Sequence, residues 1–308
     1  MLPVIFVAYL STLDESFEVF GIDMVRPAFA DRISAKNIAF RQEIMDLMDA
    51  AKLRRVVTSF HPDYVLHLAA FSSVAYSWKH PEETFLNNST IFMNLISAVR
   101  ELNEPCRILS VGSSEEYGHV PEDALPLSET YPLQPNSPYA VARVTQERLS
   151  DMYVREFGMD IVMTRSFNHI GPGQDKRFVV PSFVDRMKRI GESGADSGEI
   201  ETGNIEIIRD FVDVRDVVKA YYRLLEAGKK GEVYNVCSGK GIRLSDLIEI
   251  IAGILEVQIT TRVNPEYVRP NDIAKIIGDP NKIYRELGWK AEINCEQTLR
   301  DLVGKMIL

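Results

Sequence analysis

The stretch SVGSSEEYG, at residues 110–118, places polar groups where an apolar strand ends. Residues 107–111 are apolar enough to form a buried strand, and Ser113, Ser114 and Glu115 follow it directly. In open α/β sheets, ligands bind outside the carboxyl ends of the strands. We therefore expect the Ser113 hydroxyl and the Glu115 carboxylate to line a ligand site at this end of a sheet.

A second stretch, SPYAVAR at residues 137–143, puts a phenol and a cation four residues apart. On a helix, Tyr139 and Arg143 then share one face. A neighbouring cation favours the ionised form of a phenol, so such a tyrosine can donate or accept a proton near neutral pH. Alone, the pair could be an ordinary surface contact, but after the strand-end motif it indicates catalysis.

Strand-like and helix-like segments alternate along the first half of the chain. The segments with strand character are residues 3–7, 18–22, 37–41, 64–68, 107–111 and 160–164, and those with helical character are 45–59, 82–102 and 139–157. This alternation predicts an α/β fold, a doubly wound parallel sheet with helices on both faces. Beyond about residue 170 the pattern becomes irregular, and residues 191–198 read as a surface loop.

The composition excludes several classes of function. The chain has 308 residues, is 45% hydrophobic and carries a net charge of −9, which argues against a nucleic-acid or membrane-binding surface. The apolar start at residues 2–10 is too short to span a bilayer. Three widely spaced cysteines, with no zinc-like cluster, favour reduced thiols, no metal site and a cytoplasmic location.

In their order, the serine, the tyrosine and the helical base resemble the extended short-chain dehydrogenase/reductase family, whose helix usually reads Tyr-x-x-x-Lys. Two later stretches, RSFNHIGPGQ (165–174) and RDFVDVRD (209–216), resemble further motifs of that family. The resemblance implies a Rossmann-type sheet with a smaller, interleaved C-terminal substrate-binding domain. The core would cover residues 1–170 and continue at about 205–237, and the substrate-binding part would cover 171–204 and 238–308.

The resemblance also implies catalytic roles. Ser113 would hydrogen-bond the reacting oxygen, Tyr139 would exchange the proton, and Glu115 stands where dehydratases of the family carry a general base for the sugar C5 proton. Arg143, in place of lysine, would hold the nicotinamide ribose, but a guanidinium stays charged and cannot pass a proton as lysine might.

The family pattern assigns a cofactor site, for NAD or NADP, and a substrate site. Asp23 at the end of a strand slightly favours NAD, because an acidic residue there binds the adenosine ribose. The remaining cofactor-binding residues would be Glu43, Ile44, Leu68, Ala69, Ala70, Tyr139, Arg143 and His169. The substrate-binding residues would be Ser114, Asn168, Val180, Arg209, Arg269 and Asp272. Both arginines would bind the diphosphate of the substrate.

Within the family, the chain resembles enzymes that reduce the C4 ketone of a GDP-linked 4-keto-6-deoxy-hexose with NAD(P)H, taking GDP-4-keto-6-deoxy-D-mannose to GDP-D-rhamnose. GDP-mannose 4,6-dehydratases and other nucleotide-sugar dehydratases or epimerases are the alternative. The stretch FVVPS at residues 178–182 differs from the Phe-Val-Thr-Arg-Lys usual in those dehydratases. Relatives pair helices such as 82–102 and 139–157 in a homodimer, and by analogy we expect one here.

One departure from the family stands out at the start of the chain. The glycine fingerprint Gly-x-x-Gly-x-x-Gly, which supplies backbone N–H groups to the cofactor pyrophosphate, is absent after the expected first strand. We predict an omitted segment near Val7 and Ala8, with a break in the backbone there. If the backbone is unbroken, a protein that binds sugar nucleotides without catalysis becomes the competing hypothesis.

Overall fold

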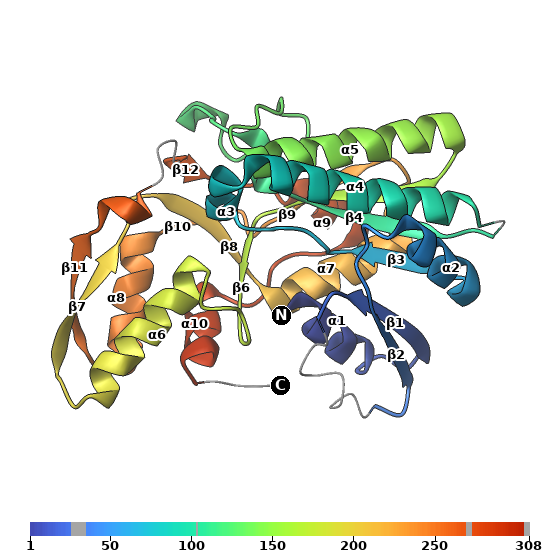
Figure 1. Ribbon diagram of the computed structural model, residues 1–308. Helices are drawn as coiled ribbons and strands as arrows, with labels where there is room; N and C mark the ends of the chain where they lie inside the picture. Colours follow the sequence, from blue (N-terminus) through green and yellow to red (C-terminus); the bar gives the residue numbers. More distant parts are fainter. Residues whose placement is uncertain (26–34, 103, 269–272, 305–308) are drawn as a thin grey trace.

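The computed structural model describes residues 1–25, 35–102, 104–268 and 273–304. Its core is a parallel sheet with the strand order β3-β4-β5-β9 (Figure 1). The strands are β3 (Tyr64–His67), β4 (Arg107–Ser113), β5 (Asp160–Ser166) and β9 (Val233–Val236). The middle strands, β4 and β5, are buried along most of their length, as expected for a sheet covered on both faces.

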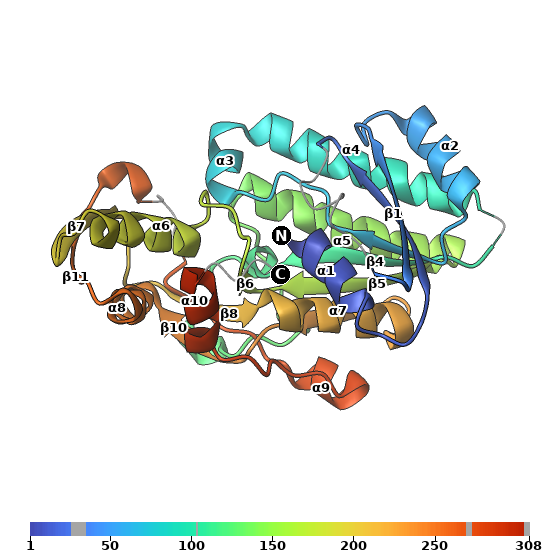
Figure 2. The same ribbon diagram turned by 90° about the horizontal axis from the view of Figure 1, so that it is seen from below.

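Helices cover the two faces of this sheet, and consecutive residues of β4 contact opposite layers. Ile108 packs in a cluster with residues of α4 (Pro81–Arg100) and α5 (Pro138–Phe157), whereas Leu109 packs with residues of α7 (Val214–Ala227). Figures 1 and 2 show α4 and α5 side by side on one face and α7 on the other. The predicted doubly wound α/β fold is therefore confirmed.

A second parallel pair lies beside the core sheet. It consists of β1 (Phe17–Asp23) and β2 (Ile38–Ile44), which are followed by α2 (Ala50–Phe60), while α3 (Val74–Lys79) follows β3. In the part of the chain that the structure describes, β1 and β2 pair with each other and with no strand of the core sheet. Side chains of both strands are only partly buried, unlike those of β4 and β5.

The start of the chain corrects one prediction. Residues 3–7 were expected as a strand, but they belong to helix α1 (Leu2–Leu10), which packs Ile5 against Val214 and Val218. A short apolar run has no period that separates a buried strand from a buried helix, and Pro3 suits the first helical turn. The backbone at Val7 and Ala8 lies within this helix, so the predicted break there is wrong.

The C-terminal elements form a second group, and β5 leads into it directly because β6 begins two residues after β5 ends. These elements are β6 (Asn168–Ile170), α6 (Val179–Glu192), β7 (Ser197–Thr202), β8 (Ile208–Asp213), β10 (Gly241–Arg243), α8 (Leu244–Leu255), β11 (Gln258–Val263), β12 (Lys275–Ile276) and α10 (Cys295–Gly304). Helix α9 (Asn281–Leu287) instead packs against α7 and β9 of the core, where Ile283 joins their hydrophobic cluster. β8 pairs with β6, β10 and β12, and β7 pairs with β11. The division into the two predicted domains stays a prediction.

Two predicted boundaries shift. Helix α2 begins at Ala50 rather than at residue 45, because the Asp49 side chain accepts the Lys52 backbone N–H at 2.9 Å and caps the first turn. Residues 191–197 are exposed as expected, but α6 and β7 take up both ends of the predicted loop. None of the described helices combines the length and the apolar character needed to cross a bilayer.

Candidate active site

Ser113 ends β4 and caps the short 3₁₀ helix η2 (Ser114–Tyr117). Its Oγ accepts the backbone N–H of Glu115 at 3.2 Å. Because a hydroxyl can accept and donate at once, the Ser113 O–H can still donate to a ligand. The sequence motif therefore places this hydroxyl at the carboxyl end of a central strand, as predicted.

Tyr139 and Arg143 lie on the first turns of α5, which packs against both β4 and η2. Ser137 starts the helix by accepting the Ala140 N–H at 3.1 Å. Arg143 donates from Nε to the phenolic oxygen of Tyr139 at 3.2 Å, and the two residues are 4% and 7% exposed. The pair predicted from its spacing is thus formed, and its catalytic role stays a prediction.

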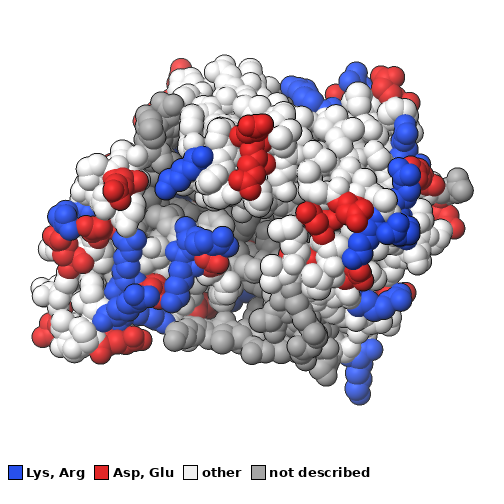
Figure 3. Space-filling view, viewed as in Figure 1, with Lys and Arg blue, Asp and Glu red and all other residues white. Residues whose placement is uncertain are grey.

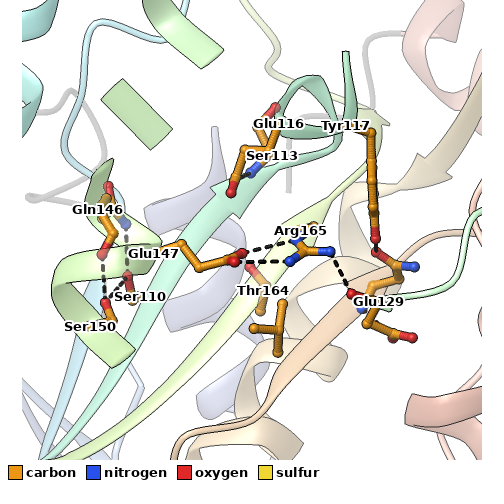
Figure 4. Close-up of polar contacts among 12 residues, drawn as sticks. Ser110, Ser113, Glu116, Tyr117, Glu129, Gln146, Glu147, Ser150, Thr164 and Arg165 are labelled. Carbon is orange, nitrogen blue, oxygen red and sulfur yellow. Dashed lines mark hydrogen bonds and ion pairs between the residues drawn. The ribbon is translucent and has the colours of Figure 1, made fainter. Parts of the chain in front are cut away.

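A buried polar network binds the guanidinium of Arg143, and Figure 4 shows the part of it where Gln146, Ser110 and Ser150 meet. Arg143 Nη1 donates to Gln146 Oε1 at 2.6 Å and to the Val111 carbonyl at 3.2 Å. Gln146 Nε2 in turn donates to Ser110 Oγ at 2.8 Å, and Ser150 Oγ donates to Ser110 Oγ at 3.2 Å. The spacing of 143, 146 and 150 on α5 could have indicated this shared helix face.

A buried ion pair lies next to this network. Arg165 on β5 donates from Nε and Nη2 to the two carboxylate oxygens of Glu147, both at 2.9 Å (Figure 4). The Arg165 guanidinium also stands over the Tyr117 ring, 4.9 Å from its centre. Burial raises the pKa of Tyr117 above its ordinary value, so this phenol stays neutral. The sequence did not predict either partner as part of the site.

The predicted adenosine-side residues lie at the ends of the β1–β2 pair. Asp23 ends β1, is exposed, and accepts the Val25 N–H at 3.1 Å. Glu43 forms an ion pair with Lys52 at 2.8 Å, and Ile44 is 46% exposed.

The predicted residues nearer the nicotinamide follow the core strands. Leu68, Ala69 and Ala70 come directly after β3 and are half-buried. His169 lies on β6, where burial lowers its pKa to about 4, and its Nδ1 has no hydrogen-bond partner among the described residues. The unsatisfied Nδ1 leaves a hydrogen-bonding position that a ligand could fill, and the buried Tyr139–Arg143 pair fits the reacting end of a nicotinamide cofactor. The described residues contain no glycine turn for the pyrophosphate end.

The predicted substrate-binding residues are spread over several elements. Ser114 in η2 is 3% exposed, Asn168 begins β6, and Val180 is 1% exposed in the core cluster around α6 and α8. Arg209 on β8 is buried and donates to the Ile208 carbonyl at 3.0 Å. Arg269 and Asp272 lie outside the described residues. All six assignments stay predictions.

Figure 3 shows a hollow on one face of the molecule, between the core half and the C-terminal half, with Lys and Arg side chains along its left rim, over α6. Acidic side chains lie among these cations in the same view, and Lys176, Arg177 and Arg189 are ion-paired with Asp185 or Asp175. Nowhere in the described ranges do three or more His, Cys, Asp or Glu side chains gather in a way that could hold a metal ion.

Comparison with known proteins gives the family. The model of the GDP-mannose 4,6-dehydratase family matches residues 8–302. The chain belongs to this family. A GDP-6-deoxy-D-mannose reductase of Pseudomonas aeruginosa is 36% identical over 243 residues, which cover 79% of this chain and 80% of the relative. A GDP-mannose 4,6-dehydratase of Yersinia enterocolitica is 29% identical, over 84% of this chain and 77% of the relative.

Solved structures of similar proteins have the same fold. RMD from Pseudomonas aeruginosa, complexed with NADPH, superposes with a TM-score of 0.82 at 30% identity, over 95% of this chain and 98% of that one. A UDP-glucose 4-epimerase of Thermotoga maritima with UDP-glucose gives a TM-score of 0.87 at 26% identity, over 99% and 95% of the two chains. The resemblance to the extended short-chain dehydrogenase/reductase family is therefore confirmed for this dehydratase-family chain.

Proposed function

We propose that the protein reduces the C4 ketone of a GDP-linked 4-keto-6-deoxy-hexose with NAD(P)H, forming GDP-D-rhamnose from GDP-4-keto-6-deoxy-D-mannose. The observation that carries the proposal is the buried Tyr139–Arg143 pair on the helix packed against the Ser113 strand end. The 36% identical relative is named a GDP-6-deoxy-D-mannose reductase, which supports this substrate class.

NAD(P)H, when bound, would supply the hydride for C4. The ketone oxygen would then take on negative charge and need a proton. Tyr139 donates that proton from its O–H, and Ser113 donates a hydrogen bond to the same oxygen. The Arg143 guanidinium, 3.2 Å from the phenolic oxygen, stabilises the phenolate that remains.

Dehydration of GDP-mannose is the second candidate, because Glu115 lies in η2, two residues after Ser113, and is only partly buried. There Glu115 would remove the C5 proton, and the cofactor would return to its starting state. One experiment separates the two reactions. The purified protein is incubated either with GDP-mannose and no reduced cofactor, or with the 4-keto-6-deoxy sugar nucleotide and NADPH or NADH.

Reduction predicts cofactor oxidation at 340 nm only when the keto sugar is present, and no product from GDP-mannose alone. A 4-keto-6-deoxy product formed from GDP-mannose would establish dehydration instead. If neither mixture reacts but GDP raises the melting temperature, the protein binds sugar nucleotides without catalysis. A ligand at a hundred times its Kd adds about 2.7 kcal/mol of stability, which a thermal melt resolves.

We further propose a homodimer through α4 and α5. These helices lie side by side on the outer face and expose large apolar side chains, whose burial in a second copy would stabilise association (Figure 1). They are Phe85, Leu86, Val141, Met152 and Phe157. Light scattering should give twice the chain mass, and Leu86→Glu should shift it towards the monomer. We also place the protein in the cytoplasm, a location that suits its free cysteines.

A further inference from the structure

Glu116 is a fully buried carboxyl group next to the candidate catalytic residues, with no part in the reaction proposed above. It lies in η2 at 0% exposure, and its Oε1 accepts the backbone N–H of Ser113 at 2.6 Å. The Ser113 side chain in turn accepts the Glu115 N–H, which completes a capping box at the end of β4. The Glu116 side chain therefore contacts the residue whose hydroxyl is proposed above to bond the reacting oxygen.

Gly112 makes room for this carboxyl group. A Cβ at position 112 would lie 2.4 Å from Glu116 Oε1 and 2.4 Å from the Thr164 carbonyl oxygen. Neither distance is possible, so only glycine lets the carboxyl group reach the strand end. A glycine inside a strand otherwise weakens it, and here it allows the close approach of Glu116.

The charged groups around Glu116 come from two elements. Glu147 and Arg143 lie on α5, and Arg165 lies on β5. Because Arg165 is held by both oxygens of Glu147, its charge is already matched. Burial, and then the charge of Glu147, raise the pKa of Glu116 to about 8. Its Oε2 is buried and has no hydrogen-bond partner among the described residues, which suits a neutral acid better than a carboxylate.

We propose that Glu116 is a positioning residue: its uncharged carboxyl group fixes the backbone of Ser113 and thereby aims the Ser113 hydroxyl at the reacting oxygen. The inference rests on the proposed keto-sugar reduction. Ionisation would place a second buried negative charge near Glu147, loosen the turn and lower the rate. The turn is therefore competent below the pKa of Glu116 and is impaired as the pH rises through it.

The test compares kcat and KM between pH 6 and 9.5 for the wild type, Glu116→Gln, Glu116→Leu and Glu129→Gln. Gln keeps the acceptor oxygen and cannot ionise, so kcat should stay within about threefold of the wild type at pH 7 and lose its decline near pH 8. Leu removes the acceptor, so kcat should fall roughly tenfold or more while KM changes little. Glu129 also accepts a backbone N–H, that of Asn235, but away from Ser113, so Glu129→Gln should keep the wild-type profile.

A second measurement is independent of activity. Hydrogen exchange of amides 110–118 should be faster in Glu116→Leu than in the wild type and unchanged in Glu116→Gln. An unaltered kcat in Glu116→Leu, or an unaltered alkaline decline in Glu116→Gln, would overturn the positioning role. If the wild type does not reduce the keto sugar, the proposed function fails, and the exchange rates alone decide whether Glu116 holds Ser113. If Glu116→Leu does not fold, Glu116→Gln carries the test.

Discussion

Arg143 donates from its Nε to the phenolic oxygen of Tyr139 across 3.2 Å, and its guanidinium also stands 5.3 Å from the centre of the Tyr139 ring. The family motif that the sequence resembles usually has lysine at this position. A guanidinium has several donors in a fixed plane, so Arg143 can bind the phenol and Gln146 at the same time. The phenol and the guanidinium are therefore bound to each other, and we expect changes at either residue or at Gln146 to affect catalysis.

Replacing Tyr139 with Phe removes the proton donor and keeps the ring. Turnover should fall by about 10²–10⁴-fold, because a placed proton donor commonly contributes that much. Cofactor binding, measured by fluorescence titration, should change little. Tyr153→Phe is the control, since Tyr153 is another buried tyrosine of α5, packed against Phe157 away from the first turn, and it should keep normal turnover. Near-normal turnover of Tyr139→Phe would show that Tyr139 is not the proton donor.

Replacing Gln146 with Leu tests the support behind Arg143. The change removes the acceptor 2.6 Å from Arg143 Nη1 and leaves buried polar groups without a partner. We expect kcat to fall roughly tenfold through misplacement of the guanidinium, and stability to fall by about 1–3 kcal/mol. Gln297→Leu, which breaks a bond to Asp301 on α10, should leave kcat unchanged. Equal kcat values for both variants would show that Gln146 has no positioning role.

Arg209→Ala tests the diphosphate assignment. The substitution removes a charged hydrogen bond worth about 1.5–3 kcal/mol. The affinities for GDP, UDP and dTDP should therefore fall at least tenfold and to the same extent. Isothermal titration with the three nucleotides measures this. Arg262→Ala on β11 is the control, because that exposed guanidinium pairs with Glu199 and should not affect binding. A loss that depends on the base would place Arg209 at the nucleobase instead.

His67 should make the protein sensitive to acid. Burial, and then the charge of Arg143, lower its pKa from 6.5 to about 3. The unfolded chain therefore takes up a proton below pH 6.5 that the folded chain does not, so stability is present above pH 6.5 and declines as the pH falls towards 3. At pH 5 the loss is about 2 kcal/mol relative to pH 7.5.

Urea denaturation at the two pH values measures this loss. His67→Gln should remove most of the difference, whereas replacing the exposed His119 with Gln should preserve it. If His67→Gln keeps the full wild-type difference, other groups cause the acid sensitivity.

The sequence predicted the parts of the site that depend on neighbours along the chain. A hydroxyl directly after a strand and a phenol four residues before a cation are local patterns, because strand ends and helix faces follow from spacing alone. Ser113, Tyr139 and Arg143 therefore come together as expected. The alternation of strands and helices likewise predicted the doubly wound core.

Predictions from local sequence patterns failed where the structure of a segment depends on packing against distant segments. Residues 2–10 carry no period that separates helix from strand, and contact with Val214 and Val218 of α7 accompanies their helical form. Gln146 binds Arg143 within one helical turn, but it also binds Ser110, which is 36 residues earlier, and no short motif reveals that second contact.

Spacing along the chain therefore predicts which groups stand at the carboxyl end of the sheet and on the face of α5. How those groups are held and charged depends on contacts between distant segments. Glu116 and its neighbour Glu115 have the same side chain. Because α5 and β5 pack over Glu116 and exclude water, burial raises the pKa of Glu116 to about 8. Burial depends on contacts far apart in the sequence, and burial controls the cost of a charge.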